Sequence, residues 1–89
     1  MRKTFTTEPE ALLMAAPTDR PFVEVWHEHD SWFGVRIMRA RADGLITRRW
    51  IVRYRDSGGK DTKDSLGDAN KGTWDAARHT ALTIRAKAK

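Results

Sequence analysis

The chain of 89 residues contains no cysteine and no apolar run approaching the roughly 18 residues of a membrane-spanning helix. The first absence excludes disulfide scaffolds and thiolate zinc sites, and the second excludes a membrane-spanning helix. The basic N-terminus is interrupted by Glu8, Pro9 and Glu10, so no signal peptide is expected. We therefore expect a cytoplasmic protein of one small domain, too short to house a large enzyme.

Lysine is absent from residues 32–55, where seven arginines accompany a single aspartate. The net charge of +5 is also unevenly distributed: residues 1–31 hold three basic and six acidic residues, whereas residues 32–89 hold 14 basic and six acidic ones. Guanidinium groups are planar donors that fit phosphates and guanine edges. An all-arginine segment therefore favours recognition of an anionic partner over a generic solubilising surface.

Period-two alternation predicts two strands around this segment, over residues 33–39 and 48–55. A third, less regular strand is expected over residues 60–66, and the dipeptides Asp43-Gly44 and Gly58-Gly59 supply the turns. The three strands form an antiparallel meander. Its apolar side is expected to consist of Phe33, Val35, Ile37, Trp50, Val52 and Tyr54.

Helices are expected near both ends of the chain. Thr7 is a good N-cap for a short helix that Pro17 ends, and Pro21 precedes an extra edge strand over residues 22–26. Thr73 is a good N-cap for a C-terminal helix over residues 76–87. A stripe of Trp74, Ala77, Ala81 and Ile84 can cover the sheet.

The predicted fold is therefore α+β, with a three-stranded antiparallel sheet packed on a C-terminal helix, a short N-terminal helix and an extra edge strand. Residues 1–21 form an N-terminal segment, and residues 22–89 form the binding domain.

The sheet face opposite the helix is expected to meet a partner. Three strands give a ribbon about 10 Å wide, close to the ~12 Å major groove of B-form DNA, so we expect binding to double-stranded DNA. The alternative is a protein-interaction patch centred on Ile51 and Met38 and rimmed by arginines. The predicted site residues are Arg36, Arg49, Ile51, Arg53, Arg55, Lys60, Lys63 and Ser65.

Other candidate sites are weaker. His27 and His29 alternate in a loop with Glu28 and Asp30, but two imidazoles do not complete a metal site, and we expect no metal and no cofactor. The Gly58-Gly59-Lys60 turn lacks the helix and the hydroxyl residue of a nucleotide-binding loop. Trp26 and Trp32 are compatible either with packing or with partner contacts.

Four segments stand in a distinctive order and spacing: Trp32 to Ile37, Arg49 to Arg55, Lys60 to Gly67, and Trp74 to Arg78. In this order and spacing they resemble the N-terminal arm-binding domain of phage-type tyrosine recombinases (integrases). The resemblance implies that the sheet lies in the major groove of arm-type attachment sites of a phage or genomic island during site-specific recombination. It also implies that other domains catalyse the reaction, and the rest of the integrase is then a partner if this chain is a fragment. The only tyrosine, Tyr54, is expected to pack on the core side with a hydrogen-bonded hydroxyl, so we expect no enzyme activity.

Overall fold

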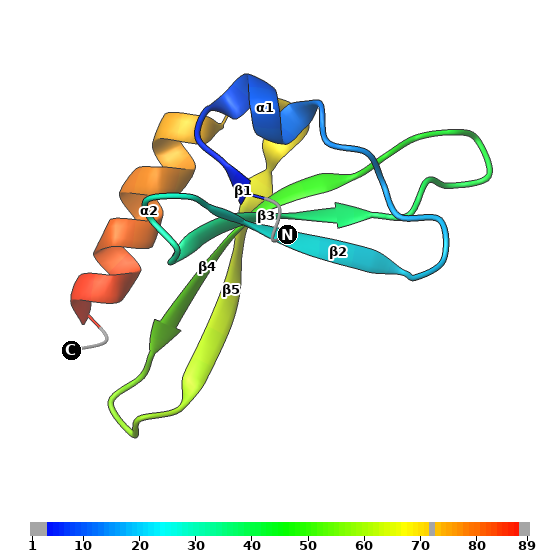
Figure 1. The fold of residues 1–89 in the computed structure, drawn as a ribbon. Helices are drawn as coiled ribbons and strands as arrows, with labels where there is room; N and C mark the ends of the chain where they lie inside the picture. The colour runs from blue at the N-terminus through cyan, green and yellow to red at the C-terminus, as the bar shows by residue number, and fades with distance from the viewer. Residues whose placement is uncertain (1–3, 72, 88–89) are drawn as a thin grey trace.

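A computed structural model describes residues 4–71 and 73–87 of the chain. All strands belong to one sheet of order β1-β2-β3-β4-β5, in which β1 is parallel to β2 and the other neighbours are antiparallel (Figure 1). The predicted α+β class is confirmed. In chain order the elements are β1 (Thr4–Phe5), α1 (Glu8–Leu12), β2 (Phe22–His27), β3 (Phe33–Met38), β4 (Arg48–Arg55), β5 (Asp61–Asp68), the 3-10 turn η1 (Ala69–Lys71) and α2 (Trp74–Lys87).

The sheet is larger than expected, with five strands instead of three and an edge strand. β2 has neighbours on both sides at its C-terminal end, where Thr4 lies opposite Trp26 and Phe5 opposite His27. Two residues are too few to show any alternation, so the sequence gives no sign of β1. Burial of Phe5, which is only 1% exposed, explains why this short strand is held in place.

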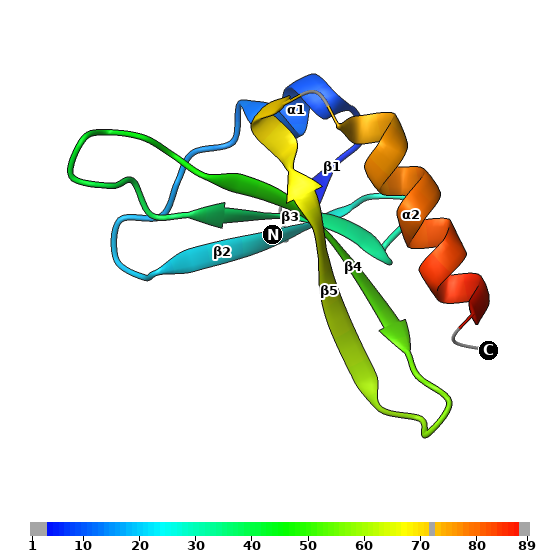
Figure 2. The ribbon, with the colours of Figure 1, turned by 180° about the vertical axis from the view of Figure 1, so that it is seen from behind.

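Both helices lie on one side of the sheet (Figures 1 and 2). Between the helices and the sheet, the Phe33 and Trp50 rings stack with centroids 5.3 Å apart, and Trp74 meets Trp50 edge-on at 5.2 Å. Ala77 and Ala81 of α2 are buried against them, as the predicted stripe requires. Phe5 and Ala11 belong to the same core, so the N-terminal segment packs with the rest of the chain.

The helix ends differ slightly from the sequence prediction. The Thr7 side chain accepts a hydrogen bond from the Glu10 amide, as expected of an N-cap, but α1 ends at Leu12, well before Pro17. α2 begins at Trp74, and the Thr73 carbonyl accepts the Ala77 amide at 2.8 Å. The Thr73 hydroxyl donates to the Asp68 carbonyl at 2.9 Å and so joins α2 to the end of β5.

A bulge interrupts the pairing of β4 with β5. Trp50 lies opposite Gly67 and Ile51 opposite Ser65, which leaves Leu66 as an extra residue. Gly67 has a φ of 123°, a conformation that side-chain-bearing residues rarely adopt. The β4–β5 hairpin continues beyond the last β3 pair, Phe33 with Val52, and projects away from α1 (Figure 2).

Over residues 4–71 and 73–87, neither helix is long and apolar enough to cross a membrane.

Candidate nucleic-acid interface

The sheet face turned away from the helices, here called the open face, carries the predicted site. Strand register places seven of the eight predicted residues there in cross-strand rows, and the eighth, Lys60, lies in the exposed β4–β5 turn. The rows are Glu24, Arg36, Arg49 and Asp68, then Trp26, Gly34, Ile51 and Ser65, then Arg53 and Lys63, then Arg55 and Asp61.

Glu24 neutralises the centre of this face. One carboxylate oxygen accepts Arg36 Nη2 at 2.7 Å and Nε at 3.1 Å, and the other accepts Lys63 Nζ at 2.8 Å. Burial of the Glu24 carboxyl raises its pKa, but hydrogen bonds and charges from Lys63 and Arg36 outweigh this effect and hold the pKa below its ordinary value. Two predicted DNA contacts, Arg36 and Lys63, are therefore already engaged within the protein.

No sequence pattern identified Glu24 as a site residue. It is separated from Arg36 by 12 positions and from Lys63 by 39. Only the register of β2, β3, β4 and β5 brings the three side chains together.

The sequence predicted Ile51 to be an exposed contact residue. The structure corrects this, because Ile51 is only 1% exposed. It shares a row with Gly34 and Trp26, and the Trp26 indole lies over Gly34 so closely that a Cβ there would be 2.6 Å from its Cε3 atom. The indole lying along this row shields the apolar centre of the face from solvent. Trp26 is itself only 8% exposed and is a packing residue.

Arg53 is fixed above this indole. Its guanidinium carbon lies 4.2 Å from the ring centroid of Trp26, and its Nε donates to the Ser31 carbonyl at 2.6 Å. Over the described residues, neither terminal amino group of Arg53 donates a hydrogen bond. Arg53 is thus held at Nε and over the Trp26 ring, while both of its terminal amino groups are left without a hydrogen-bond partner among the described residues.

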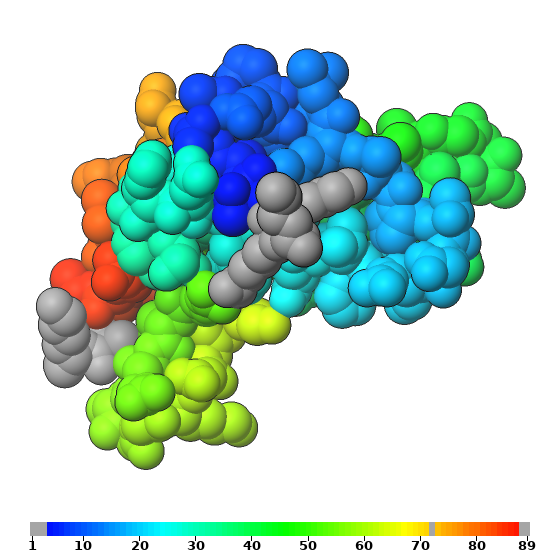
Figure 3. Space-filling model, in the orientation of Figure 1, coloured from blue at the N-terminus to red at the C-terminus, as the bar shows by residue number. Residues whose placement is uncertain are grey.

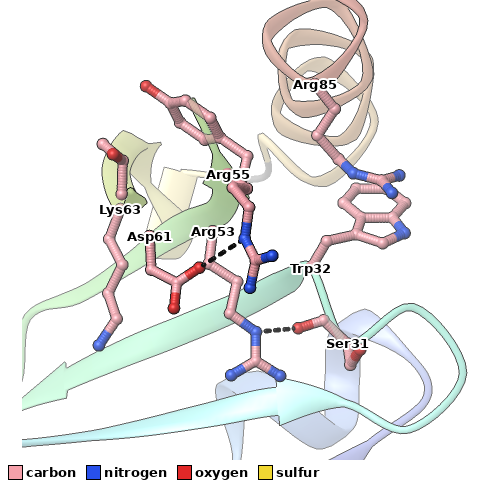
Figure 4. A pocket seen from close by; sticks show the side chains of 9 residues that line it. Ser31, Trp32, Arg53, Arg55, Asp61, Lys63 and Arg85 are labelled. Atoms are coloured by element: carbon pink, nitrogen blue, oxygen red, sulfur yellow. Dashed lines mark hydrogen bonds and ion pairs between the residues drawn. The ribbon is translucent and has the colours of Figure 1, made fainter. Parts of the chain in front are cut away.

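A pocket of about 610 Å³ opens beside Arg53, between the β4–β5 hairpin and the end of α2 (Figure 4). Four basic side chains line it, and Asp61 is its single acidic residue, 3.5 Å from Arg55. The guanidinium of Arg85 lies 4.6 Å from the ring centroid of Trp32, which forms another wall. The sequence prediction missed Arg85 because it lies on the helix rather than on the sheet face. The basic residues are Arg53, Arg55, Lys63 and Arg85.

The remaining predicted residues are accessible. Arg49, Lys60 and Ser65 are all exposed, and within residues 4–71 and 73–87 neither Arg49 nor Lys60 forms a side-chain ion pair. Arg55 is paired with Asp61 only at 3.5 Å, and both of these side chains are exposed. Arg49, Arg53, Arg55 and Lys60 are therefore the predicted basic residues that Glu24 does not engage.

The His27 ring forms structural hydrogen bonds within and beside the histidine-containing loop. His27 is buried, and its Nδ1 accepts the amides of His29 at 3.1 Å and Asp30 at 3.0 Å, while Nε2 lies 3.1 Å from the Thr6 carbonyl. Both ring nitrogens thus have backbone partners. The part of the chain that the structure describes contains no group of three or more His, Cys, Asp or Glu able to hold a metal ion.

Asp30 connects this loop to α2. It accepts Arg78 Nη2 at 2.6 Å, and this hydrogen bond lowers the pKa of Asp30 below its ordinary value. The Arg78 guanidinium also lies 5.3 to 5.5 Å from the ring centroids of Trp32, Phe33 and Trp74. Arg78 therefore holds the helix against the β2–β3 loop.

Tyr54 has the hydrogen-bonded hydroxyl that the sequence predicted. It donates to Asp64 Oδ2 at 2.8 Å, and the hydrogen bond to this carboxylate raises the pKa of Tyr54. The phenol is therefore held in its protonated, hydrogen-donating form.

Comparison with known proteins gives no match to this chain among protein-family models, curated proteins or solved structures.

Proposed function

We propose that this chain binds double-stranded DNA through the open sheet face, as the arm-site-binding domain of a phage or genomic-island integrase. The observation that supports this proposal most is the alignment of Arg49, Arg53 and Arg55 along β4, on the face that no helix covers. Guanidinium groups at fixed strand positions suit both phosphates and base edges in a major groove. Catalysis of strand exchange belongs, in this proposal, to other domains.

The contacts are not distributed evenly over the face. Arg53 and Arg55 lie beside the pocket at the hairpin end with Lys60 in the adjoining turn, while Arg49 lies farther along β4. Arg36 and Lys63 are bound to Glu24 and serve to shape the face. Four cations therefore carry the interaction, instead of the six that the sequence suggests.

The protein-interaction alternative has less support. Its proposed apolar centre is covered, since Ile51 is buried, and Met38 is half-buried. A protein-binding surface normally presents accessible apolar or aromatic anchors at its centre.

A salt titration tests the proposal. Binding of a labelled duplex, measured by fluorescence anisotropy, should weaken with salt at a log–log slope of about −3.6 or steeper, because each of four phosphate contacts contributes about −0.9. The double variant Arg49→Ala/Arg55→Ala should make the slope shallower by about 1.8.

Lys71→Ala/Lys87→Ala is the matched control, because it removes the same charge from η1 and α2, which do not belong to the open face. Absence of duplex binding, or an equal loss in the control and the arginine variant, would refute the proposal.

A further inference from the structure

A second arginine cluster lies at the opposite end of β4 from the hairpin. A pocket of about 530 Å³ is lined by Arg39 and Arg41 of the β3–β4 loop and by Arg49 of β4, together with Pro21 and Thr47. The loop stands clear of the body of the molecule (Figure 3, green, right). Neither Arg39 nor Arg41 belongs to the site predicted from the sequence.

The loop that carries Arg41 has a defined internal structure. The Arg41 amide donates to the Leu45 carbonyl at 2.9 Å, and the Gly44 amide donates back to the Arg41 carbonyl at 2.8 Å. Gly44 has a φ of 84°, which favours glycine, and Asp43 Oδ1 accepts the Leu45 amide at 3.0 Å. The backbone positions of the arginines are therefore set before any ligand arrives.

A backbone hydrogen bond also holds Arg39 in place. Its amide donates to the Pro21 carbonyl at 2.9 Å, which joins the start of the loop to the segment before β2. Thr47 closes the other side, where its carbonyl accepts the Met38 amide at 2.9 Å.

Over the part of the chain that the structure describes, no carboxylate lies within hydrogen-bonding distance of the arginines of this pocket. Among residues 4–71 and 73–87, Arg39 and Arg49 form no ion pair, and Arg41 forms a long, exposed one with Asp43, at 3.8 Å. In contrast, Glu24 holds Arg36 at 2.7 Å and Lys63 at 2.8 Å. Three arginines that line one hollow, without a neutralising carboxylate at hydrogen-bonding distance, suit a tetrahedral oxyanion such as phosphate.

We propose that Arg39, Arg41 and Arg49 form a phosphate-binding pocket that holds the DNA backbone beyond the edge of the open face. This inference rests on the proposed DNA-binding function and deepens it. Arg49 belongs both to the face and to the pocket, so one duplex can reach both. β4 then carries a basic pocket at each end, with the centre neutralised by Glu24 between them.

The test compares Arg39→Ala/Arg41→Ala with the wild-type chain and with Lys71→Ala/Lys87→Ala in the same duplex titration. Two further phosphate contacts bring the expected wild-type slope to about −5.4, and the Arg39/Arg41 variant should return it to about −3.6. The corresponding loss of affinity is about 60-fold at ~0.1 M salt, because each contact contributes about 0.9 log unit per decade below 1 M. Both side chains are exposed, so an unchanged thermal unfolding midpoint should accompany the loss.

The outcomes separate the two proposals. If the wild-type chain binds the duplex and the Arg39/Arg41 variant keeps the wild-type slope, the pocket proposal is wrong and the open-face proposal stands. An equal change in the lysine control would also overturn the pocket proposal, since any two positive charges would then suffice. If the wild-type chain does not bind DNA, both proposals fail.

Discussion

At the scale of single residues, Glu24 controls how much positive charge the open face presents. It is mostly buried and occupies one cation with each carboxylate oxygen. A carboxylate within a DNA-binding face opposes phosphate directly and also withdraws Arg36 and Lys63 from it. Glu24 therefore holds Arg36 and Lys63 in fixed positions and lowers the attraction of the open face for phosphate.

Glu24→Gln should therefore change stability and DNA affinity in opposite directions. Loss of the charged hydrogen bonds should lower the free energy of unfolding by about 1–2 kcal/mol, a reduced value because Arg36 and Lys63 are partly solvent-exposed. The freed cations should tighten duplex binding and steepen the salt slope by up to about 1.8. Urea unfolding and anisotropy titrations measure the two effects.

Glu28→Gln is the matched control, because Glu28 is exposed in the β2–β3 loop. It should leave stability nearly unchanged and alter binding only weakly. Weaker duplex binding by Glu24→Gln in a folded protein would show that Glu24 positions Arg36 and Lys63 as DNA contacts, contrary to our assignment.

At the scale of elements, the contact between β2 and β3 depends on Gly34. A Cβ at this position would lie 2.6 Å from the Trp26 ring and 2.7 Å from the Val25 carbonyl oxygen. The second of these atoms belongs to the backbone and has little freedom to move. Gly34 thus allows Trp26 to lie flat on the sheet and support Arg53.

Gly34→Ala should therefore destabilise the fold by about 1–3 kcal/mol through overpacking. Gly58→Ala is the control, because its only close neighbour would be Asp56 Oδ1 at 3.4 Å, and it should stay within about 0.5 kcal/mol of wild type. Thermal and urea unfolding monitored by tryptophan fluorescence measure both variants. Equal stability of the two alanine variants would show that β2 and β3 do not meet as described.

The elements with readable periodicity could be predicted, and the others could not. Alternation in β3 and β4 and the alanine stripe of α2 indicated which sides form the core, and burial of Val35, Trp50 and Ala77 confirms this. β1 was not predicted, because a strand of two residues shows no periodicity and its residues pair with residues 22 positions away in the sequence. Its presence depends on tertiary burial of Phe5, which no local signal contains.

The candidate site was predictable as a face but not as a set of contacts. Period two correctly placed Arg49 and Arg53 on the side away from the helices. It could not show that Trp26 lies along the row that contains Ile51, or that Glu24 binds two of the cations, because both facts depend on register between distant strands. The sequence prediction did not include Arg39 and Arg41, because they lie in a loop, where no strand or helix periodicity indicates which way a side chain points.

At the scale of the whole molecule, two ion pairs connect segments that are distant in the sequence. Glu24 links β2 to Lys63 of β5 across the open face, and Asp30 links the β2–β3 loop to Arg78 of α2 on the other side. Both carboxyl groups have pKa values below their ordinary values of 4.5 and 3.8. The folded state consequently binds fewer protons than the unfolded chain in the acidic range.

Stability should therefore depend on pH in a defined direction. A carboxyl group whose pKa is lowered by folding stabilises the native state above its unfolded pKa, and this contribution is lost as the pH falls through the folded pKa. We expect the thermal unfolding midpoint, followed by circular dichroism, to be nearly constant from pH 7 to about 5 and to fall below about pH 4.5. The double variant Glu24→Gln/Asp30→Asn should start from a lower midpoint and lose less of it on acidification, because its amides do not titrate. A wild-type midpoint that stays constant to pH 3, or an equally steep fall in the double variant, would show that these two pairs do not hold the sheet and helix together.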